Sequence, residues 1–215
     1  MNHLHSILKI QRVNIMRKLR LLPCALFVLL AFLSSAMQAQ GVQTVPVVSR
    51  SVERKVDLPG EFLPYESLAI QLALAAGGLI AWASMAKIDA RLAARLVRVA
   101  QLAFGICALV FGTAHFVYMD LTAPLVPHWL PPNQEFWAYA TGVAHIAAGI
   151  AIITHVQARL AAVLLTVMFA SFTPLVHLPM LLATPSSHWI WNENAVNIAL
   201  IGAAWVVADS LARRR

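Results

Sequence analysis

Five continuous apolar runs, each about as long as a bilayer is thick, constrain this chain more than any other feature of its sequence. They lie at roughly residues 68–86, 99–118, 136–154, 160–182 and 190–211. A helix of about 20 apolar residues crosses the hydrocarbon core of a membrane, so each run is long enough to span it. A transmembrane β-barrel would show short alternating segments instead. The runs therefore predict an all-α bundle of four to five transmembrane helices.

The composition argues against a soluble globular protein. Of the 215 residues, 60% are hydrophobic and only 12% are charged, which is about half the charged share of an ordinary soluble domain. The net charge of +7 alone would suggest nucleic acid, but the 16 Lys and Arg residues lie in short clusters between apolar runs. Membrane topology accounts for that distribution, so we expect no nucleic-acid partner. Cys24 and Cys107 lie inside apolar runs and form no CxxC pair, which supports neither a disulfide framework nor a thiolate metal site.

The first 40 residues have the pattern of a secretory signal. Basic residues precede the apolar run 21–33, and small residues follow it at Ser34, Ser35, Ala36 and Ala39. We expect residues 1–40 to be a signal peptide, cut after Ala36 or Ala39, or an uncleaved anchor helix. A compact basic group directly follows Met16, so either Met1 or Met16 serves as the start.

Residues 41–67 differ from the rest of the chain because they are polar, mixed in charge and rich in β-branched residues. We expect a short periplasmic stub of two extended strands, with turns at Pro59-Gly60 and Pro64. The blocks VPVV (45–48), VERKV (52–56), LPGEF (58–62) and PYESLAI (64–70) resemble the mature N-terminus of periplasmic adaptors (membrane fusion proteins) of RND efflux pumps. In that family these strands begin a β-barrel domain, and lipoyl and hairpin domains follow. The resemblance covers about residues 42–71 without those domains, so it implies no adaptor activity.

Lys and Arg occur only on alternate connections between the apolar runs. From residue 68 onward, four lie between the first two runs, one between the third and fourth, and three after the fifth (Lys87, Arg91, Arg95, Arg98, Arg159, Arg213, Arg214, Arg215). Loops 119–135 and 183–189 contain none. The positive-inside rule makes the basic side cytoplasmic. We therefore expect a multi-pass protein of the bacterial inner (cytoplasmic) membrane, with residues 41–67 periplasmic and the C-terminus cytoplasmic.

Three histidines lie inside the apolar runs, where ionisable groups are expensive and mark candidate functional sites. A rise of 1.5 Å per residue puts His115 roughly 5 Å, His177 roughly 8 Å and His145 roughly 14 Å from the outer ends of their runs. Glu193 and Asn197 open the last run on the same side. These residues form the candidate intramembrane polar site, and we assign no catalytic residue. No HxxxH or HExxH pair is present, so the sequence predicts no metal site.

Glycines accompany two of these histidines. Gly112 precedes His115 by three residues and Gly142 precedes His145 by three, with further glycines seven residues away at Gly105 and Gly149. Small residues spaced by seven share a helix face and permit close packing, so we expect these histidines to face neighbouring helices. Two interpretations stay open. In the structural one, each imidazole hydrogen-bonds a backbone carbonyl, Ser or Thr across a helix pair. In the functional one, the histidines have a quinone-binding, haem-binding or proton-handling role.

A second resemblance covers about residues 72–215. The blocks FGTAHF (111–116), LVPHWLPP (125–132), FWAYATGVAHIAAG (136–149), HLP (177–179) and NIALIGAAW (197–205) resemble the DoxX-like family of small bacterial membrane proteins. The resemblance implies a compact bundle of about four helices and, in some relatives, a link to quinol oxidase or thiol-redox systems. It transfers no site residue. The chain would thus join an adaptor-like stub to a DoxX-like bundle, as a natural fusion or as the product of a gene rearrangement.

Three function classes remain open. The main hypothesis is a non-catalytic or redox-accessory membrane protein whose histidines face a quinone or a membrane redox partner. A small-solute or proton transporter would use the same histidines as a relay, but the sequence shows no inverted repeat and no intramembrane carboxylate beyond Glu193 and Asp209. A truncated efflux adaptor joined to a membrane protein is the third. Substrate, cofactor and oligomeric state do not follow from the sequence.

Overall fold

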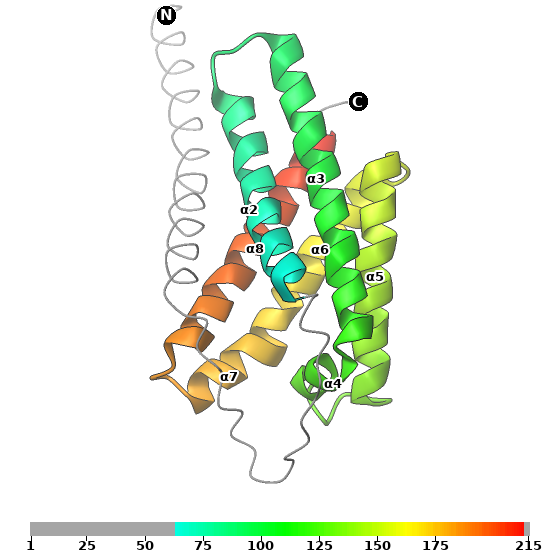
Figure 1. Ribbon diagram of the computed structural model, residues 1–215, viewed down its shortest axis with the longest axis vertical. Coiled ribbons are helices and arrows are strands. Elements are labelled where there is room, and N and C mark those ends of the chain that lie inside the picture. The colour runs from blue at the N-terminus through cyan, green and yellow to red at the C-terminus, as the bar shows by residue number, and fades with distance from the viewer. Residues whose placement is uncertain (1–62, 213–215) are drawn as a thin grey trace, which may run out of the picture.

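A computed structural model of the chain describes residues 63–212. The predicted signal, most of the predicted stub and the last three arginines lie outside this range. Within it the chain is a bundle of antiparallel helices joined by short turns, and it contains no strand (Figure 1). Four spans are α2 (Leu63–Met85), α3 (Ala90–Val117), α5 (Gln134–Thr154) and α8 (His188–Ala212). The fifth is composite: α6 (Ala158–Phe172), a π-helical turn η2 (Thr173–His177) and α7 (Leu178–Ala183).

Five helices of the described region are long and apolar enough to cross a membrane: 65–85, 90–117, 134–154, 158–183 and 188–212. This confirms the predicted all-α bundle. Large apolar side chains such as Val143, Leu164 and Ile198 are exposed on its outer surface. A soluble monomer rarely exposes so much apolar surface, whereas lipid accommodates it.

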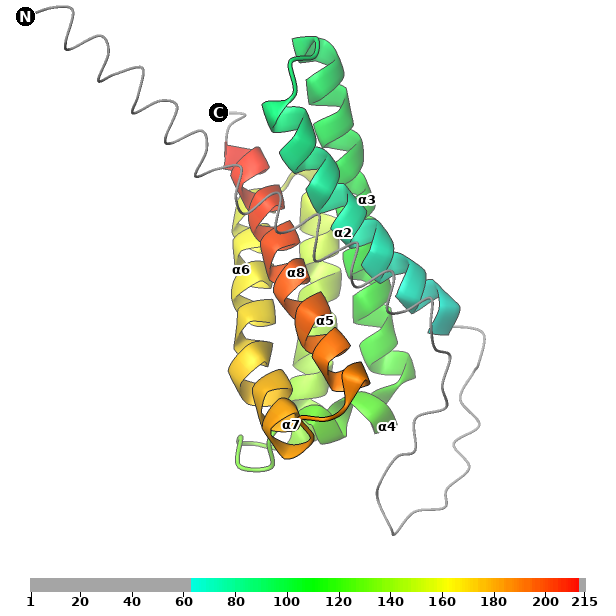
Figure 2. The ribbon, with the colours of Figure 1, turned by 90° about the vertical axis from the view of Figure 1, so that its left-hand side faces the viewer.

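Two helix starts differ from the prediction. Residues 63–67 belong to α2, so the end of the predicted stub is helical, and so is the PYESLAI block of the adaptor resemblance. Helix α3 begins at Ala90, nine residues before its apolar run, because the Asp89 carboxylate caps it. This carboxylate accepts hydrogen bonds from the backbone N–H of Arg91 (2.9 Å) and Leu92 (3.1 Å). The predicted basic connection is therefore mostly helix, and α2 and α3 project beyond the other helices at that end (Figure 2).

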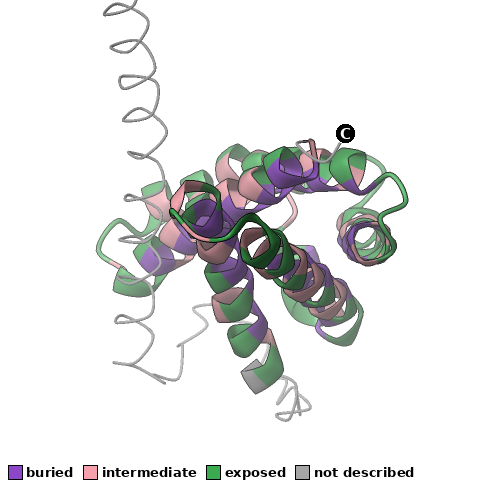
Figure 3. Cartoon of the chain, turned by 90° about the horizontal axis from the view of Figure 1, so that it is seen from above, coloured by how far each residue is buried: buried purple, intermediate pink, exposed green. Residues whose placement is uncertain are grey.

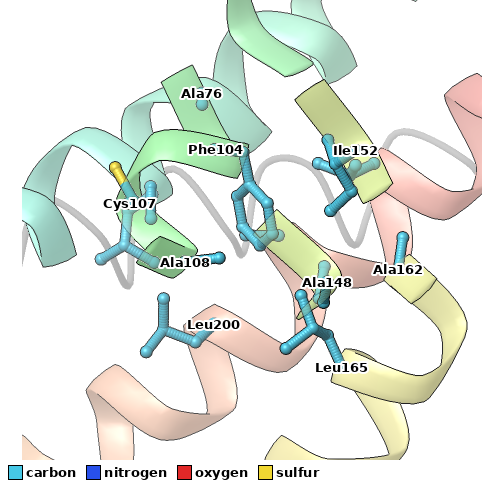
Figure 4. Close-up of a cluster of buried hydrophobic side chains, with 14 of the residues drawn as sticks. Ala76, Phe104, Cys107, Ala108, Ala148, Ile152, Ala162, Leu165 and Leu200 are labelled. Atoms are coloured by element: carbon cyan, nitrogen blue, oxygen red, sulfur yellow. The ribbon is translucent and has the colours of Figure 1, made fainter. Parts of the chain in front are cut away.

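The spans pack in a closed circuit, α2 on α3, α3 on α5, α5 on α6, α6 on α8 and α8 on α2. Buried residues line its inside and exposed residues its outside (Figure 3). Figure 4 shows the centre, where Phe104 of α3 lies among small and branched side chains of the other helices, including Ala148, Ile152, Leu165 and Leu200. Small residues dominate this core, which lets the helix backbones approach each other closely.

Helices α3 and α5 approach each other closely, and glycines face each other between them at two levels. A Cβ atom added to Gly112 would lie 2.7 Å from the Gly142 carbonyl oxygen, and one added to Gly149 would lie 2.7 Å from the Gly105 carbonyl oxygen. No side chain fits at these distances. The expectation that the four glycines permit close packing is therefore confirmed.

An arginine closes the other end of the same helix pair. The Arg98 guanidinium of α3 donates to the carbonyl oxygens of Ile153 (2.8 Å) and Ile152 (3.4 Å) in the last turn of α5. These carbonyls lack partners within a helix, and the positive charge also suits the helix C-terminus. Arg98 thus contributes to the basic end of the chain and also holds α3 against α5.

Tryptophans mark both ends of the bundle. Four tryptophans, Trp129, Trp137, Trp189 and Trp191, lie at or near the end formed by residues 118–133 and 184–187. There the indoles of Trp137 and Trp191 donate to the carbonyls of Pro131 (2.8 Å) and Pro185 (2.9 Å). Trp82 and Trp205 are exposed toward the opposite end. Aromatic belts at two levels are typical of membrane-spanning proteins.

We predict that Gly112→Ala destabilises the bundle by about 1–3 kcal/mol, because the new methyl group overlaps the backbone of α5. The assay is thermal unfolding in detergent in a Cys24→Ser background, followed by the reaction of buried Cys107 with a fluorogenic maleimide.

The matched control is Gly78→Ala in α2, since nothing lies within 4 Å of a Cβ atom at that position. Its unfolding temperature should stay unchanged or rise slightly, because alanine favours the helix. Equal effects of the two substitutions would contradict the close α3–α5 contact.

Candidate functional site

His145 lies in the middle of α5 and is buried, with 2% of its surface exposed. Its Nδ1 atom is 2.9 Å from the carbonyl oxygen of Thr141, one turn earlier in the same helix. A carbonyl oxygen only accepts hydrogen bonds, so Nδ1 carries the proton and donates it. The Nε2 atom of the neutral ring therefore carries a lone pair. This bond agrees with the structural interpretation of the histidines, except that it lies within one helix rather than across a pair.

His115 of α3 stacks on His145, and we call these two residues the histidine pair. Their ring centroids are 5.5 Å apart and the ring planes differ by 25°. The glycine contact brings the two helices together here, because a Cβ atom on Gly142 would lie only 3.0 Å from Cβ of His115. Both histidines thus face a neighbouring helix, as expected, and they also contact each other, which the sequence did not predict.

Two phenylalanines complete the surroundings of His145. The Phe111 ring of α3 lies edge-on at 6.0 Å, and the Phe169 ring of α6 lies at 5.4 Å, both measured between centroids. Neither ring offers a conventional hydrogen-bond donor. The histidine pair and these two phenylalanines form what we call the histidine cluster, an aromatic group with few polar atoms contributed by three helices.

One polar atom of this cluster has no partner. The Nδ1 atom of His115 is buried and makes no hydrogen bond to any described residue. An unsatisfied buried polar group costs roughly 1–3 kcal/mol relative to a hydrogen-bonded one. A ligand that gave this nitrogen a hydrogen bond would recover part of that cost.

The depth of His115 differs from the prediction. Distances from the helix ends placed it about 9 Å nearer the outer end than His145, yet the two rings stack. The reason is that the C-terminal end of α3 lies deeper in the bundle than the N-terminal end of α5, so a residue near the end of α3 is level with the middle of α5. Two short elements, α4 (Met119–Thr122) and η1 (Ala123–Leu125), pack on the outer part of α5 in its place. The histidine pair therefore lies near the middle of the bundle, at the depth predicted for His145.

The geometry of the histidine pair does not fit bis-histidine haem ligation. Two axial imidazoles direct nitrogen atoms at one iron from opposite faces of the macrocycle, whereas His115 and His145 stack face to face with no room for a macrocycle between them. In the described part of the chain, no three His, Cys, Asp or Glu side chains gather as ligands of a metal ion.

Asn197 of α8 binds the backbone of the composite span α6–η2–α7. Its side-chain amide donates to the carbonyl oxygen of Phe169 (3.2 Å) and to the Thr173 hydroxyl (3.0 Å). The backbone N–H of Thr173 donates to the carbonyl oxygen of Ala170, and Pro174 has no N–H. Neither residue therefore donates to the carbonyl oxygen of Phe169. The Phe169 carbonyl therefore lacks its usual partner within the helix and accepts from Asn197 instead. Asn197 lies next to the histidine cluster but acts on the α6 backbone.

His177 lies apart from the histidine pair. Its carbonyl oxygen accepts a hydrogen bond from the side chain of Asn194 (3.2 Å), and its half-buried ring makes no ring contact with His115 or His145 in the described region. The structure therefore joins His177 to α8 rather than to the other two histidines. The predicted site of three histidines separates into two parts.

Glu193 has a neighbour that the sequence analysis overlooked. Its carboxyl group lies within electrostatic range of Glu66 in the first turn of α2. Both residues are half-buried and both fall inside candidate membrane spans. The sequence assigned Glu66 to the exported stub, whereas the structure places it in α2, where it adds a carboxyl group near Glu193.

We predict that Asn197→Leu lowers the stability of the bundle by about 1–3 kcal/mol, since it leaves the Phe169 carbonyl oxygen without a side-chain donor. The Cys107 maleimide assay described above measures the change.

Thr113→Val is the control, because the exposed Thr113 hydroxyl bonds only to the Leu109 carbonyl of its own helix (2.9 Å). It should change the unfolding temperature little. An Asn197→Leu protein as stable as the Thr113→Val protein would show that the Phe169 carbonyl needs no partner from α8.

Comparisons with known proteins give one match. Residues 104–208, just under half of the chain, match the model of a family described as "Domain of unknown function (DUF8561)". The matched region begins inside α3 and contains the whole histidine cluster, but it leaves out α2 and Glu66. No curated protein and no solved structure matches the chain.

Proposed function

We propose that the chain is a multi-pass protein of the bacterial inner membrane, with its basic end in the cytoplasm, which holds a quinone-type headgroup as a redox-accessory protein. The proposal of a quinone site rests on His115, whose ring stacks on His145 and whose buried Nδ1 atom has no partner among the described residues. The DoxX-like resemblance of residues 72–215 favours the same function, because some relatives are linked to quinol oxidase or thiol-redox systems.

The distribution of charge supports the orientation. Lys87, Arg91, Arg95 and Arg159 are exposed at one end of the bundle. The opposite end carries Glu66, Asp120, Glu135 and Glu193, and no Lys or Arg lies there among residues 63–212. The positive-inside rule assigns the basic end to the cytoplasm.

The histidine cluster suits a quinone headgroup for two reasons. A flat ring packs well against the faces and edges of Phe111, Phe169 and His145, with which it shares shape and polarisability. Its oxygen atoms give the unpaired nitrogen of His115 the hydrogen bond that the described protein residues do not provide. The membrane-spanning helices bring this site within reach of a ligand dissolved in lipid.

We predict that the purified protein in lipid nanodiscs binds a benzoquinone or benzoquinol with a decyl tail, and that His115→Phe weakens binding about tenfold. The substitution keeps an aromatic ring beside His145 but removes the unpaired nitrogen, at a cost of about one buried hydrogen bond. Calorimetric titration measures the affinity.

His128→Ala is the control, because His128 is exposed in the loop after η1. The His128→Ala protein should bind the decyl quinone or quinol with the same affinity as the unaltered protein. Absence of binding, or equal loss in both variants, would contradict the proposed site.

The orientation predicts which residues a membrane-impermeant maleimide reaches in intact spheroplasts. In a Cys24→Ser background, Ser186→Cys in the turn before α8 should be labelled and Ala90→Cys at the start of α3 should not. Both positions are exposed, whereas Cys107 is buried. The reverse pattern would mean that the basic end faces outward.

A transporter of protons or small solutes is a second candidate. The specific observation in its favour is the approach of Glu66 to Glu193 between α2 and α8, because intramembrane carboxyl groups often carry protons. Uptake of a solute into proteoliposomes that depends on a pH gradient and is lost in Glu193→Gln would favour transport over the accessory role.

A further inference from the structure

The hydrogen bond of His145 restricts what its other nitrogen can bind. Nδ1 donates its proton to the Thr141 carbonyl oxygen, 2.9 Å away. The neutral ring therefore presents only a lone pair at Nε2. In the described region this is the only hydrogen bond of His145. The surrounding rings of Phe111 and Phe169 give Nε2 no donor.

We infer that the histidine cluster selects the hydroxyl-bearing, reduced form of its ligand over the carbonyl-bearing, oxidised form, with Nε2 of His145 accepting the hydroxyl proton. This inference rests on the proposed function, because it assumes that a ring with oxygen substituents enters the site. It adds the direction of the hydrogen bond to His145, in which the ligand donates and the imidazole accepts.

The chemistry of the two forms explains the selection. A benzoquinone oxygen is a carbonyl and only accepts, so two lone pairs would face each other at Nε2 of His145. A hydroquinone oxygen carries a proton and donates it to that nitrogen. His115 does not discriminate in the same way, since either of its tautomers is compatible with its unpartnered Nδ1. Selection therefore depends on His145, whose tautomer the Thr141 carbonyl fixes.

The test compares three ligands of nearly the same shape on the full chain in nanodiscs under anaerobic conditions: a decyl benzoquinone, its hydroquinone, and the dimethyl ether of that hydroquinone. The ether has neither a donor nor redox activity. We expect the hydroquinone to bind about tenfold more tightly than either of the other two.

Two substitutions of His145 separate its nitrogens. The side-chain amide of Asn reaches the position of Nδ1 and that of Gln reaches the position of Nε2. His145→Asn keeps a donor for the Thr141 carbonyl but removes the acceptor, so it should bind all three ligands with equal, weaker affinity. His145→Gln keeps an acceptor where the lone pair was, and it should retain part of the preference for the hydroquinone.

The outcomes distinguish this inference from the proposed function. If none of the three ligands binds the unaltered protein, the proposed quinone site itself is wrong. If the quinone binds as tightly as the hydroquinone or more tightly, the site stands and the selection by His145 is refuted. A preference that persists in His145→Asn would also refute it. The comparison of ligands on the unaltered protein decides the matter even where a substitution impairs folding.

Discussion

The distance between α3 and α5 is set by glycine facing glycine at two levels, and the position of the histidine pair follows from that distance. At each level a backbone carbonyl occupies the space where a side chain would begin. In a bilayer no hydrophobic force drives helices together, so close van der Waals packing of this kind supplies much of the attraction. One turn from the Gly112–Gly142 contact, His115 meets His145. Arg98 holds the far end of the same pair by binding carbonyls of α5.

Much of the fold could be predicted from the sequence because lipid permits few solutions. Uninterrupted apolar runs in a bilayer have to be helices, and their glycines at a spacing of seven identify the faces that meet. The start of α3 escaped prediction because Arg91 and Arg95 lower the local hydropathy, while the cap at Asp89 adds two helical turns regardless of it. Hydropathy reports where a helix lies in the membrane, whereas capping decides where it begins.

The candidate site could be predicted only in part. The spacing of glycine and histidine placed His115 and His145 between helices, because helical periodicity is a local property. Phe111, Phe169 and Glu66 were missed, since their roles depend on which helices are neighbours and sequence periodicity carries no such information. The sequence grouped His177, Glu193 and Asn197 with the histidine pair, but their positions on neighbouring helices give them other partners.

The amide of Asn197 on the Phe169 carbonyl has a consequence for the biogenesis of the protein. Helix α6 leaves the ribosome well before α8, which is the last helix of residues 63–212. Until α8 arrives, the freed carbonyl faces a medium that offers few donors, and several kcal/mol oppose stable residence of α6 alone in the lipid core. The short turn 184–187 places α8 directly beside α6. We therefore expect α6 and α8 to enter the bilayer together, as one helical hairpin.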